Sequence, residues 1–396
     1  MTAVDKLSVA TRRADDTWLS RDGADLATFA AETARQTDLA AWPHAAGCER
    51  NILIYDGDAV RKARMDAAMT RSLTAEWAHA LRSGPGVIVI KRAIADTAIV
   101  DRATAIFEDL ITAQQTAGTG GGDHFAKPGA NDRVWNALQK HCEADAENFA
   151  RYYASPAIAL ASLAWLGPNY QMTAQVNRVN PGGAAQSAHR DYHLGFMSTD
   201  EALRYPASCH EISPFMTLQG AVAHCDMPLE SGPTLFLPYS QNFSHGYVLF
   251  ETPQFQQHFN SHHVQLPLEK GDAVFFNPAL MHAAGTNRST NIYRMANLLQ
   301  VSSAFGRAME TVDRIACAKA LYPALLEATM SESETLDAIA ACAEGYAFPT
   351  NLDRDPPISG LAPKSQAAFM YEALKAGMSP GNFSAALDAL EAKRGA

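Results

Sequence analysis

Residues 268 to 298 read LEKGDAVFFNPALMHAAGTNRSTNIYRMANL, and this stretch holds two strand-like runs joined by a polar turn. The turn KGD precedes the apolar run AVFF, and His282 follows as the chain leaves that run. Arg294 lies in the next run, after the turn GTNRST. Short runs rich in β-branched and aromatic residues, bounded by Gly, Pro, Asn and Ser, are typical of strands. The stretch therefore predicts β-structure that carries one histidine and one arginine.

Runs of the same texture recur between about residues 170 and 305. They are QMTAQVNRV (171–179), FMTLQGAVAHC (215–225), PTLFLP (233–238), HHVQLPL (262–268), DAVFFNP (272–278) and NIYRMANLLQVS (291–302). Many short strands at this spacing favour a β-sandwich or a barrel. The central part of the chain is therefore expected to be β-rich.

Helical patterns flank this β-rich part. In the first 165 residues apolar positions recur mainly at helical spacing, with GVIVI (86–90) as one expected strand. A polar, Gly-rich stretch over 116–133 is expected to be a loop. Near the end of the chain, Ser379 followed by Pro380 is typical of a helix start. We expect an N-terminal helical extension (1–84), a β-rich domain (85–305) and a C-terminal helical region (306–396).

The composition excludes several classes of partner. The 396 residues include 42 acidic and 32 basic side chains, a formal charge of −10, so the surface should repel nucleic acid and gain nothing from anionic membranes. The N-terminus lacks the apolar core of a secretory signal, and the longest apolar run, PAIALASLAWLG, is too short to span a bilayer. The six cysteines show no paired spacing, which predicts reduced core residues. We therefore expect a cytoplasmic protein.

Histidines gather in the β-rich part, where nine of the 13 lie between residues 189 and 282. The stretch SAHRDYHLGF (187–196) places His189, Asp191 and His193 at alternate positions, which share one face of a strand. Such an imidazole and carboxylate can bind one metal ion. Geometry alone does not choose between the two histidines.

A third ligand must come from a distant strand, and His282 is the best candidate. Two histidines and one carboxylate on one face of an ion form the facial triad of non-haem Fe(II) oxygenases. Arg294 would suit a bidentate grip on a carboxylate co-substrate. The His189 and Asp191 pair (an HxD motif) followed by His282 and Arg294 indicates such an oxygenase much more specifically than the HxD motif alone.

Over roughly residues 85 to 305, the sequence resembles the phytanoyl-CoA dioxygenase family of Fe(II)- and 2-oxoglutarate-dependent oxygenases. The landmarks that carry the resemblance are QVNRVNPGG (175–183), HRDYH (189–193), SGPTLFLPYSQNFSHG (231–246) and KGDAVFFNPALMHAAGTNRSTNIYR (270–294). The resemblance implies an α+β fold, with a double-stranded β-helix (jelly-roll, cupin-like) core and the N- and C-terminal helices packed around it. It also implies that residues 85–305 form the dioxygenase domain.

The resemblance also implies roles for individual residues. His189, Asp191 and His282 would bind Fe(II), and Arg294 would bind the distal carboxylate of 2-oxoglutarate. At the other end of the co-substrate we expect Gln175 and Gln219. Members of the family often carry a hydroxyl-bearing residue two positions after the distal histidine, where this chain has Ala284. One co-substrate hydrogen bond must then come from elsewhere.

The implied activity is oxidation by O2, in which a C–H bond of a small metabolite is hydroxylated and 2-oxoglutarate leaves as succinate and CO2. We expect His193, Tyr192 and Phe196 on the substrate side of the iron. No basic patch matches the phosphates of coenzyme A, which favours a small metabolite over a thioester.

Two other functions stay open. A cupin-type metal-dependent isomerase or a 2-oxoglutarate-independent dioxygenase would need a shell richer in histidine, with His193 as a ligand, and would not need Arg294. A non-catalytic jelly roll that binds a small molecule could also retain the ligands. The sequence does not indicate an oligomeric state.

Overall fold

The computed structural model describes residues 14–22, 25–118, 129–193, 195, 197–358 and 360–395. Most of the described strands form one eight-stranded sheet, in the order β1-β2-β3-β8-β6-β10-β5-β4. Their bounds are β1 (Gly47–Glu49), β2 (Ile52–Asp56), β3 (Val87–Lys91), β4 (Asn131–Val134), β5 (Gln171–Val179), β6 (Thr217–Ala223), β8 (Ala273–Phe276) and β10 (Arg294–Ser302). Neighbouring strands of this sheet are antiparallel except for the parallel pair β2 and β3.

A second, smaller sheet pairs β7 (Leu235–Phe236) with β9 (His282–Ala283). Isolated bridges extend it, from His189 to His282 and from Phe236 to Val264. The large sheet and this small one form the expected double-stranded β-helix core, with helices packed around it, so that prediction is confirmed.

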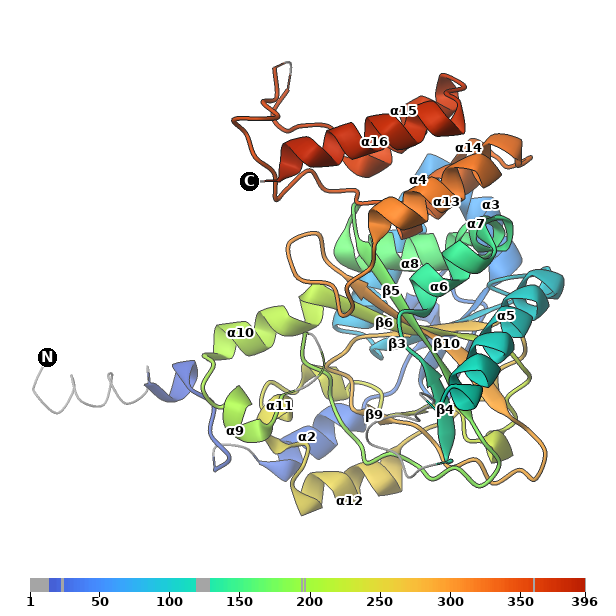
Figure 1. Cartoon of the computed structure of the whole chain (residues 1–396). Helices are drawn as coiled ribbons and strands as arrows, with labels where there is room; N and C mark the ends of the chain where they lie inside the picture. Colours follow the sequence, from blue (N-terminus) through green and yellow to red (C-terminus); the bar gives the residue numbers. More distant parts are fainter. Residues whose placement is uncertain are drawn as a thin grey trace, which may run out of the picture.

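One layer of helices covers the outer face of the large sheet, as Figure 1 shows for α6, α7, α8 and α13. The helices of this side of the molecule are α3 (Gly57–Arg64), α4 (Ala67–Arg82), α5 (Thr97–Thr116), α6 (Ala137–Ala144), α7 (Ala146–Tyr153), α8 (Pro156–Leu166), α13 (Arg314–Glu327), α14 (Glu332–Cys342), α15 (Gln366–Lys375) and α16 (Pro380–Arg394). Alternate residues of β5 and β10, such as Ala174 and Leu299, are buried in the main hydrophobic core with these helices.

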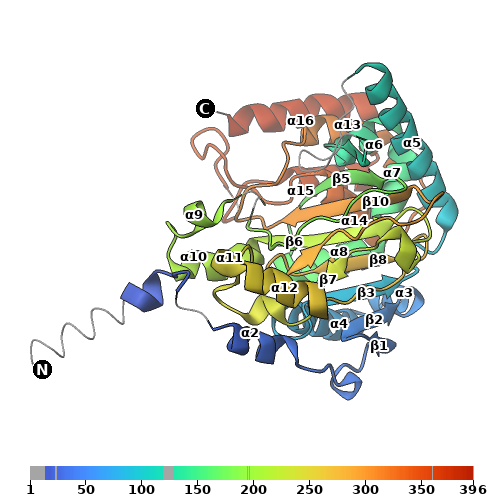
Figure 2. The same ribbon diagram turned by 90° about the horizontal axis from the view of Figure 1, so that it is seen from below.

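The opposite side carries the small sheet and a second set of short helices. Figure 2 shows α12 and β7 in front of the strands β6 and β8. The remaining described helical elements are α2 (Leu26–Thr33), η1 (Leu39–Ala41), α9 (Thr199–Ala202), α10 (Ala207–Ile212), η2 (Ser213–Met216), η3 (Leu229–Ser231), η4 (Ser240–Asn242), α11 (Gly246–Leu249) and α12 (Pro253–His262). Of these, η2 packs against α8, where Phe215 stacks on Trp165. A second apolar cluster, which includes Phe29, Phe243 and Phe255, holds α2 and α12 to the small sheet.

Strand alternation decides which residues of the large sheet face its inner side. β5 and β10 pair antiparallel over nine residues, from Arg294 opposite Val179 to Ser302 opposite Gln171. Because side chains alternate along a strand, residues at every second position share a face. On β10 these are Arg294, Ala296, Leu298 and Gln300, and all four line one internal cavity.

The N-terminal part of the chain differs from its sequence pattern. β1 and β2 join the large sheet, although the pattern before residue 84 indicated helices only. The long helical pattern that follows them is split into α3 and α4 at Met65 and Asp66, because the Asp66 side chain caps a new helix start. β4 begins at Asn131, inside the stretch that was expected to be loop, and residues 119–128 of that stretch lie outside the described part. The division into three regions at 84 and 305 stays a prediction.

The end of the chain agrees with its sequence pattern. Helix α16 begins at Pro380, and the Ser379 side chain accepts a hydrogen bond from the backbone N–H of Asn382. Within the described residues, no helix combines the length and the apolar character that a membrane crossing requires.

Candidate active site

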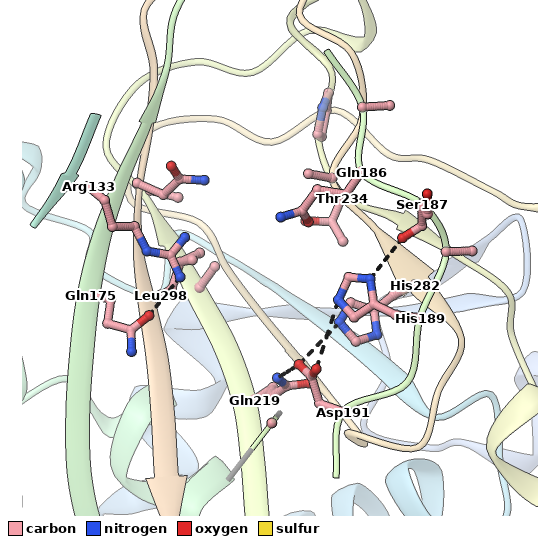
Figure 3. A pocket seen from close by; sticks show the side chains of 18 of the residues that line it. Arg133, Gln175, Gln186, Ser187, His189, Asp191, Gln219, Thr234, His282 and Leu298 are labelled. Atoms are coloured by element: carbon pink, nitrogen blue, oxygen red, sulfur yellow. Dashed lines mark hydrogen bonds and ion pairs between the residues drawn. The ribbon is translucent and has the colours of Figure 1, made fainter. Parts of the chain in front are cut away.

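Three side chains from two separated segments meet at the inner side of the barrel. His189 and Asp191 come from an extended segment after β5, and His282 begins β9. Asp191 Oδ1 lies 4.0 Å from His189 Nε2, and Asp191 Oδ2 lies 3.8 Å from His282 Nε2. One potential ligand atom from each residue lies within 4.8 Å of the other two. Figure 3 shows the three groups converging on one point of the cavity.

Both imidazoles are held in the tautomer that a metal requires. His189 Nδ1 lies 2.9 Å from the carbonyl oxygen of Ser187, and His282 Nδ1 lies 2.8 Å from that of Leu280. A carbonyl oxygen only accepts hydrogen bonds, so each Nδ1 carries the proton and each Nε2 keeps its lone pair. Burial and, to a smaller extent, the nearby His189 lower the pKa of His282 to about 4. The donor set fits Fe(II) in a facial triad.

Asp191 is held through both its backbone and its carboxylate. The Asp191 backbone N–H donates to the carbonyl oxygen of Pro278 at 3.0 Å. Gln219 Nε2, on β6, donates to Asp191 Oδ2, and the Tyr247 hydroxyl donates to the Asp191 carbonyl oxygen at 3.1 Å. Partners of this kind orient a ligand before the metal arrives.

Arg190, between the two ligands, anchors the segment from behind. Its guanidinium is buried and donates to the carbonyl oxygens of Ser240 and, at 3.0 Å, Phe243. Burial lowers the pKa of Arg190 to about 10. Gly246 leaves room for this group, since a Cβ there would lie 1.8 Å from Arg190 Cζ. No local pattern around Arg190 predicts this anchor.

Arg294 lies at the start of β10 and is 7% exposed. It donates weakly to the carbonyl oxygens of Ser231, at 3.3 Å, and Gly285, at 3.4 Å. Burial lowers its pKa to about 10, and within the described residues its hydrogen bonds go to carbonyl oxygens and not to a carboxylate. A buried cation without a charged partner suits an incoming carboxylate.

The triad and Arg294 share one cavity of about 1390 Å³. Gln175 and Gln219 also line it, as does Arg133 of β4, which the sequence analysis did not single out. Arg133 was missed because β4 lies in a stretch whose Gly-rich composition indicated a loop.

Two of the predicted substrate residues, Tyr192 and His193, directly follow Asp191 in the chain. The Tyr192 hydroxyl lies 2.7 Å from His210 Nδ1, and its ring packs on Tyr247. His193 Nδ1 lies 2.7 Å from Thr217 Oγ1, and burial lowers the pKa of His193. Neither residue is among those that line the cavity, and their substrate roles stay predictions. Phe196 lies outside the described residues.

Comparison with known proteins gives one family match. Residues 70–296 match the model of the family described as Phytanoyl-CoA dioxygenase (PhyH). No curated protein sequence matches the chain.

Several solved structures are similar. The non-haem α-ketoglutarate-dependent epimerase SnoN from nogalamycin biosynthesis is 20% identical, with 60% of this chain and 85% of that one covered and a TM-score of 0.42. The carbocyclase SnoK from the same biosynthesis is 20% identical, with 59% and 86% covered and a TM-score of 0.42. EvdMO1 is 16% identical, with 58% and 50% covered and a TM-score of 0.42.

Proposed function

The chain belongs to the phytanoyl-CoA dioxygenase family, and from this premise we propose that it is an Fe(II)- and 2-oxoglutarate-dependent dioxygenase that hydroxylates a C–H bond of a small metabolite. The observation that carries the proposal is one cavity that joins the His189, Asp191 and His282 cluster to the buried Arg294. A metal isomerase or a simple binding protein would have no need of the second feature.

Each residue of the cluster has a defined task in this proposal. His189 and His282 present Nε2 to Fe(II), because each Nδ1 proton is held by a carbonyl oxygen. Asp191 supplies a carboxylate oxygen, which Gln219 orients by its hydrogen bond. When bound, iron with 2-oxoglutarate and O2 supplies the oxidising chemistry, with succinate and CO2 as the co-products.

Arg294 would hold the distal carboxylate of 2-oxoglutarate and thereby fix its direction in the cavity. Charge-assisted hydrogen bonds from a guanidinium to a carboxylate are among the strongest available. Its two carbonyl contacts, at 3.3 and 3.4 Å, are long enough to be exchanged for that carboxylate at small cost. Gln219 and Gln175 were predicted at the other end of the co-substrate. Gln219 would lie near the iron, because it donates a hydrogen bond to Asp191.

The surroundings of the cluster exclude water from one side. Phe276 of β8 meets the His282 ring edge to face, with centroids 4.7 Å apart. His282 is 6% exposed. A dry wall behind the ligands favours the neutral form of His282 and would leave the open side of the iron directed into the cavity.

The partner class proposed is a small molecule. A cavity of about 1390 Å³ exceeds what the ten non-hydrogen atoms of 2-oxoglutarate need, so a second compound fits beside it. The formal charge of −10 disfavours nucleic acid. The cytoplasmic location expected from the sequence stays a prediction.

A metabolite screen tests the proposal. The full chain, reconstituted with Fe(II), 2-oxoglutarate and O2, is incubated with metabolite pools, and succinate is measured. We expect succinate above the background in at least one pool, a product that gains one oxygen atom, and loss of both with Asp191→Ala. Loss of two hydrogens would instead indicate desaturation or cyclisation. Turnover without 2-oxoglutarate, or no turnover in any pool, would count against the proposed activity.

A further inference from the structure

The two neighbours of Asp191 in the chain anchor the metal-binding segment. Side chains alternate along an extended chain, so Arg190 and Tyr192 are expected to point away from the face that carries the Asp191 carboxylate. The Arg190 guanidinium reaches the carbonyl oxygens of Ser240 and Phe243. Tyr192 is 9% exposed and is not among the residues that line the cavity. Asp191 therefore lies between two side chains that are buried in the protein.

The hydroxyl of Tyr192 has a defined partner. It lies 2.7 Å from Nδ1 of His210, on α10, and both residues are buried. His210 Nε2 lies 3.2 Å from the carbonyl oxygen of Tyr205, which only accepts, so Nε2 carries the ring proton and Nδ1 accepts the proton of the Tyr192 hydroxyl. Burial lowers the pKa of His210, which favours this neutral imidazole. The hydrogen bond therefore has one direction, from Tyr192 to His210.

Tyr247, on α11, packs against this pair. Its ring centroid lies 4.7 Å from that of Tyr192 and 6.1 Å from that of His210. Figure 2 shows α11 beside α10. The Tyr247 hydroxyl donates to the carbonyl oxygen of Asp191 at 3.1 Å. The cluster that holds the Tyr192 side chain thus also holds the Asp191 backbone.

A third contact holds the residue that follows Tyr192. The backbone N–H of His193 donates to Ser213 Oγ at 2.7 Å, and Ser213 begins η2, directly after α10. Three consecutive residues, 191–193, are therefore bound by α11, α10 and η2 in turn. None of these three bonds reaches the Asp191 carboxylate itself, so their common effect is on the direction in which this carboxylate projects.

A metal site requires its ligands within about 0.5 Å of their productive positions. We propose that Tyr192 and His210 are positioning residues of the metal site, and that the hydrogen bond between them directs the Asp191 carboxylate toward Fe(II). Tyr192 then belongs to the metal site and not to the substrate side. The inference rests on the proposed function for the role of Asp191 as a metal ligand, and its test needs neither 2-oxoglutarate nor the substrate.

Removal of this hydrogen bond tests the proposal. Tyr192→Phe and His210→Leu should each lower the Fe(II) affinity of the full chain about tenfold, at the low end of the effect of an outer-shell partner. The double variant should lose no more than either single variant, because both changes remove the same bond. His210→Asn, which keeps an acceptor near the position of Nδ1, should recover part of the affinity. Anaerobic competition with a metal-binding dye measures all four constants.

Two further measurements separate positioning from a loss of stability. Co(II) in place of Fe(II) gives visible d–d bands that depend on ligand geometry, and these bands should change in Tyr192→Phe. Urea denaturation of the metal-free chains gives the stability of each variant.

The matched control is Tyr152→Phe. The Tyr152 hydroxyl lies 2.9 Å from Nε2 of the buried His224, and neither residue lines the cavity. This change removes a hydrogen bond of the same kind, so it should lower the stability and leave the Fe(II) affinity and the Co(II) bands unchanged.

The outcomes separate this inference from the proposed function. An Fe(II) affinity unchanged in Tyr192→Phe, an equal loss in Tyr152→Phe, or identical affinities of His210→Asn and His210→Leu would overturn it. So would Co(II) bands that Tyr192→Phe leaves unchanged. If Tyr192→Phe weakens Fe(II) binding as expected and the wild type fails to bind 2-oxoglutarate, the positioning role stands and the proposed activity fails.

Discussion

His189 and His282 are hydrogen-bonded to each other through their backbones. The N–H of His189 donates to the carbonyl oxygen of His282 at 2.9 Å, and the N–H of His282 donates to that of His189 at 3.0 Å. Their rings lie with centroids 4.4 Å apart. Two residues distant in the sequence are therefore fixed side by side by main-chain bonds, so the metal site is formed before any metal arrives.

This pairing predicts different results for the two histidines of the HxDxH stretch. His189→Ala removes a ligand and should weaken Fe(II) binding by more than about 100-fold, beyond the loss typical of an outer-shell partner. His193→Ala should change the affinity little, because its Nδ1 is engaged with Thr217 outside the cluster. Anaerobic metal titration measures both. Equal losses would show that the assignment of ligands is wrong.

Gln219 should act on the metal through Asp191. Replacement by Leu removes the hydrogen bond to Asp191 Oδ2 and should lower the Fe(II) affinity about 10- to 100-fold. The control is Gln300→Leu, since Gln300 is paired with Gln219 on the next strand and has no contact with a ligand. Competition with a metal-binding dye gives both constants. Similar affinities for the two variants would remove Gln219 from the metal site.

The anchor formed by Arg190 predicts that Gly246 tolerates no side chain. In Gly246→Ala the new Cβ would displace the Arg190 guanidinium from the carbonyl oxygens of Ser240 and Phe243. We expect a loss of about 1–3 kcal/mol in the free energy of unfolding, as for overpacked interiors. Gly381→Ala, in a helix where a Cβ meets nothing within 4 Å, should stabilise by about 0.5–1 kcal/mol. Urea denaturation distinguishes the signs, and a neutral Gly246→Ala would refute the anchor.

Buried histidines behind the large sheet predict a pH dependence of stability. Burial lowers the pKa of His224 to about 3, and its ring lies 2.8 Å from Thr104 Oγ1 and 2.9 Å from the Tyr152 hydroxyl. The pKa of an unfolded histidine is near 6.5. Between about pH 6.5 and 3 the unfolded chain therefore binds one more proton than the folded chain, and the free energy of unfolding decreases as the pH is lowered. The free energy lost is on the order of 1.4 kcal/mol for each unit of pKa difference.

The contribution of His224 is measured by the slope of the unfolding free energy against pH. His224→Gln should flatten the dependence of the unfolding free energy on pH below 6.5, and the exposed control His262→Gln should leave it unchanged. Urea titrations at several pH values give the slopes. A slope unaltered by His224→Gln would mean that other groups cause the acid lability.

The sequence predicted the β-rich core because its strands carry local signals. The run QMTAQVNRV coincides with β5. The turn KGD lies directly before β8, and the turn GTNRST lies shortly before β10. The candidate ligands were found for the same reason, since HxD alternation and a histidine after an apolar strand are visible within short windows. The structure brings His189, Asp191 and His282 together as the pattern required.

Other features depend on contacts that no short window contains. β1 and β2 are strands because β3 provides an edge for them to pair with, whereas their residues lie among helical patterns. Arg133 faces the cavity because β4 pairs with β5, and the Gly-rich composition before it gave no sign of a strand. The anchor of Arg190 needs the backbone of a loop 50 residues away. Such tertiary placement decides which polar side chains meet a ligand.

In the proposed function, one cavity binds Fe(II) and 2-oxoglutarate together, with Arg294 as the carboxylate partner. The most direct test is an anaerobic titration of the Fe(II)-loaded chain with 2-oxoglutarate, followed by the weak visible charge-transfer band of the chelate. We expect a saturable band in the wild type. In Arg294→Ala we expect unchanged Fe(II) binding and an affinity for 2-oxoglutarate lowered about 10- to 100-fold, from the loss of charge-assisted hydrogen bonds. No band in the wild type, or an affinity that Arg294→Ala leaves unchanged, would contradict the proposed function.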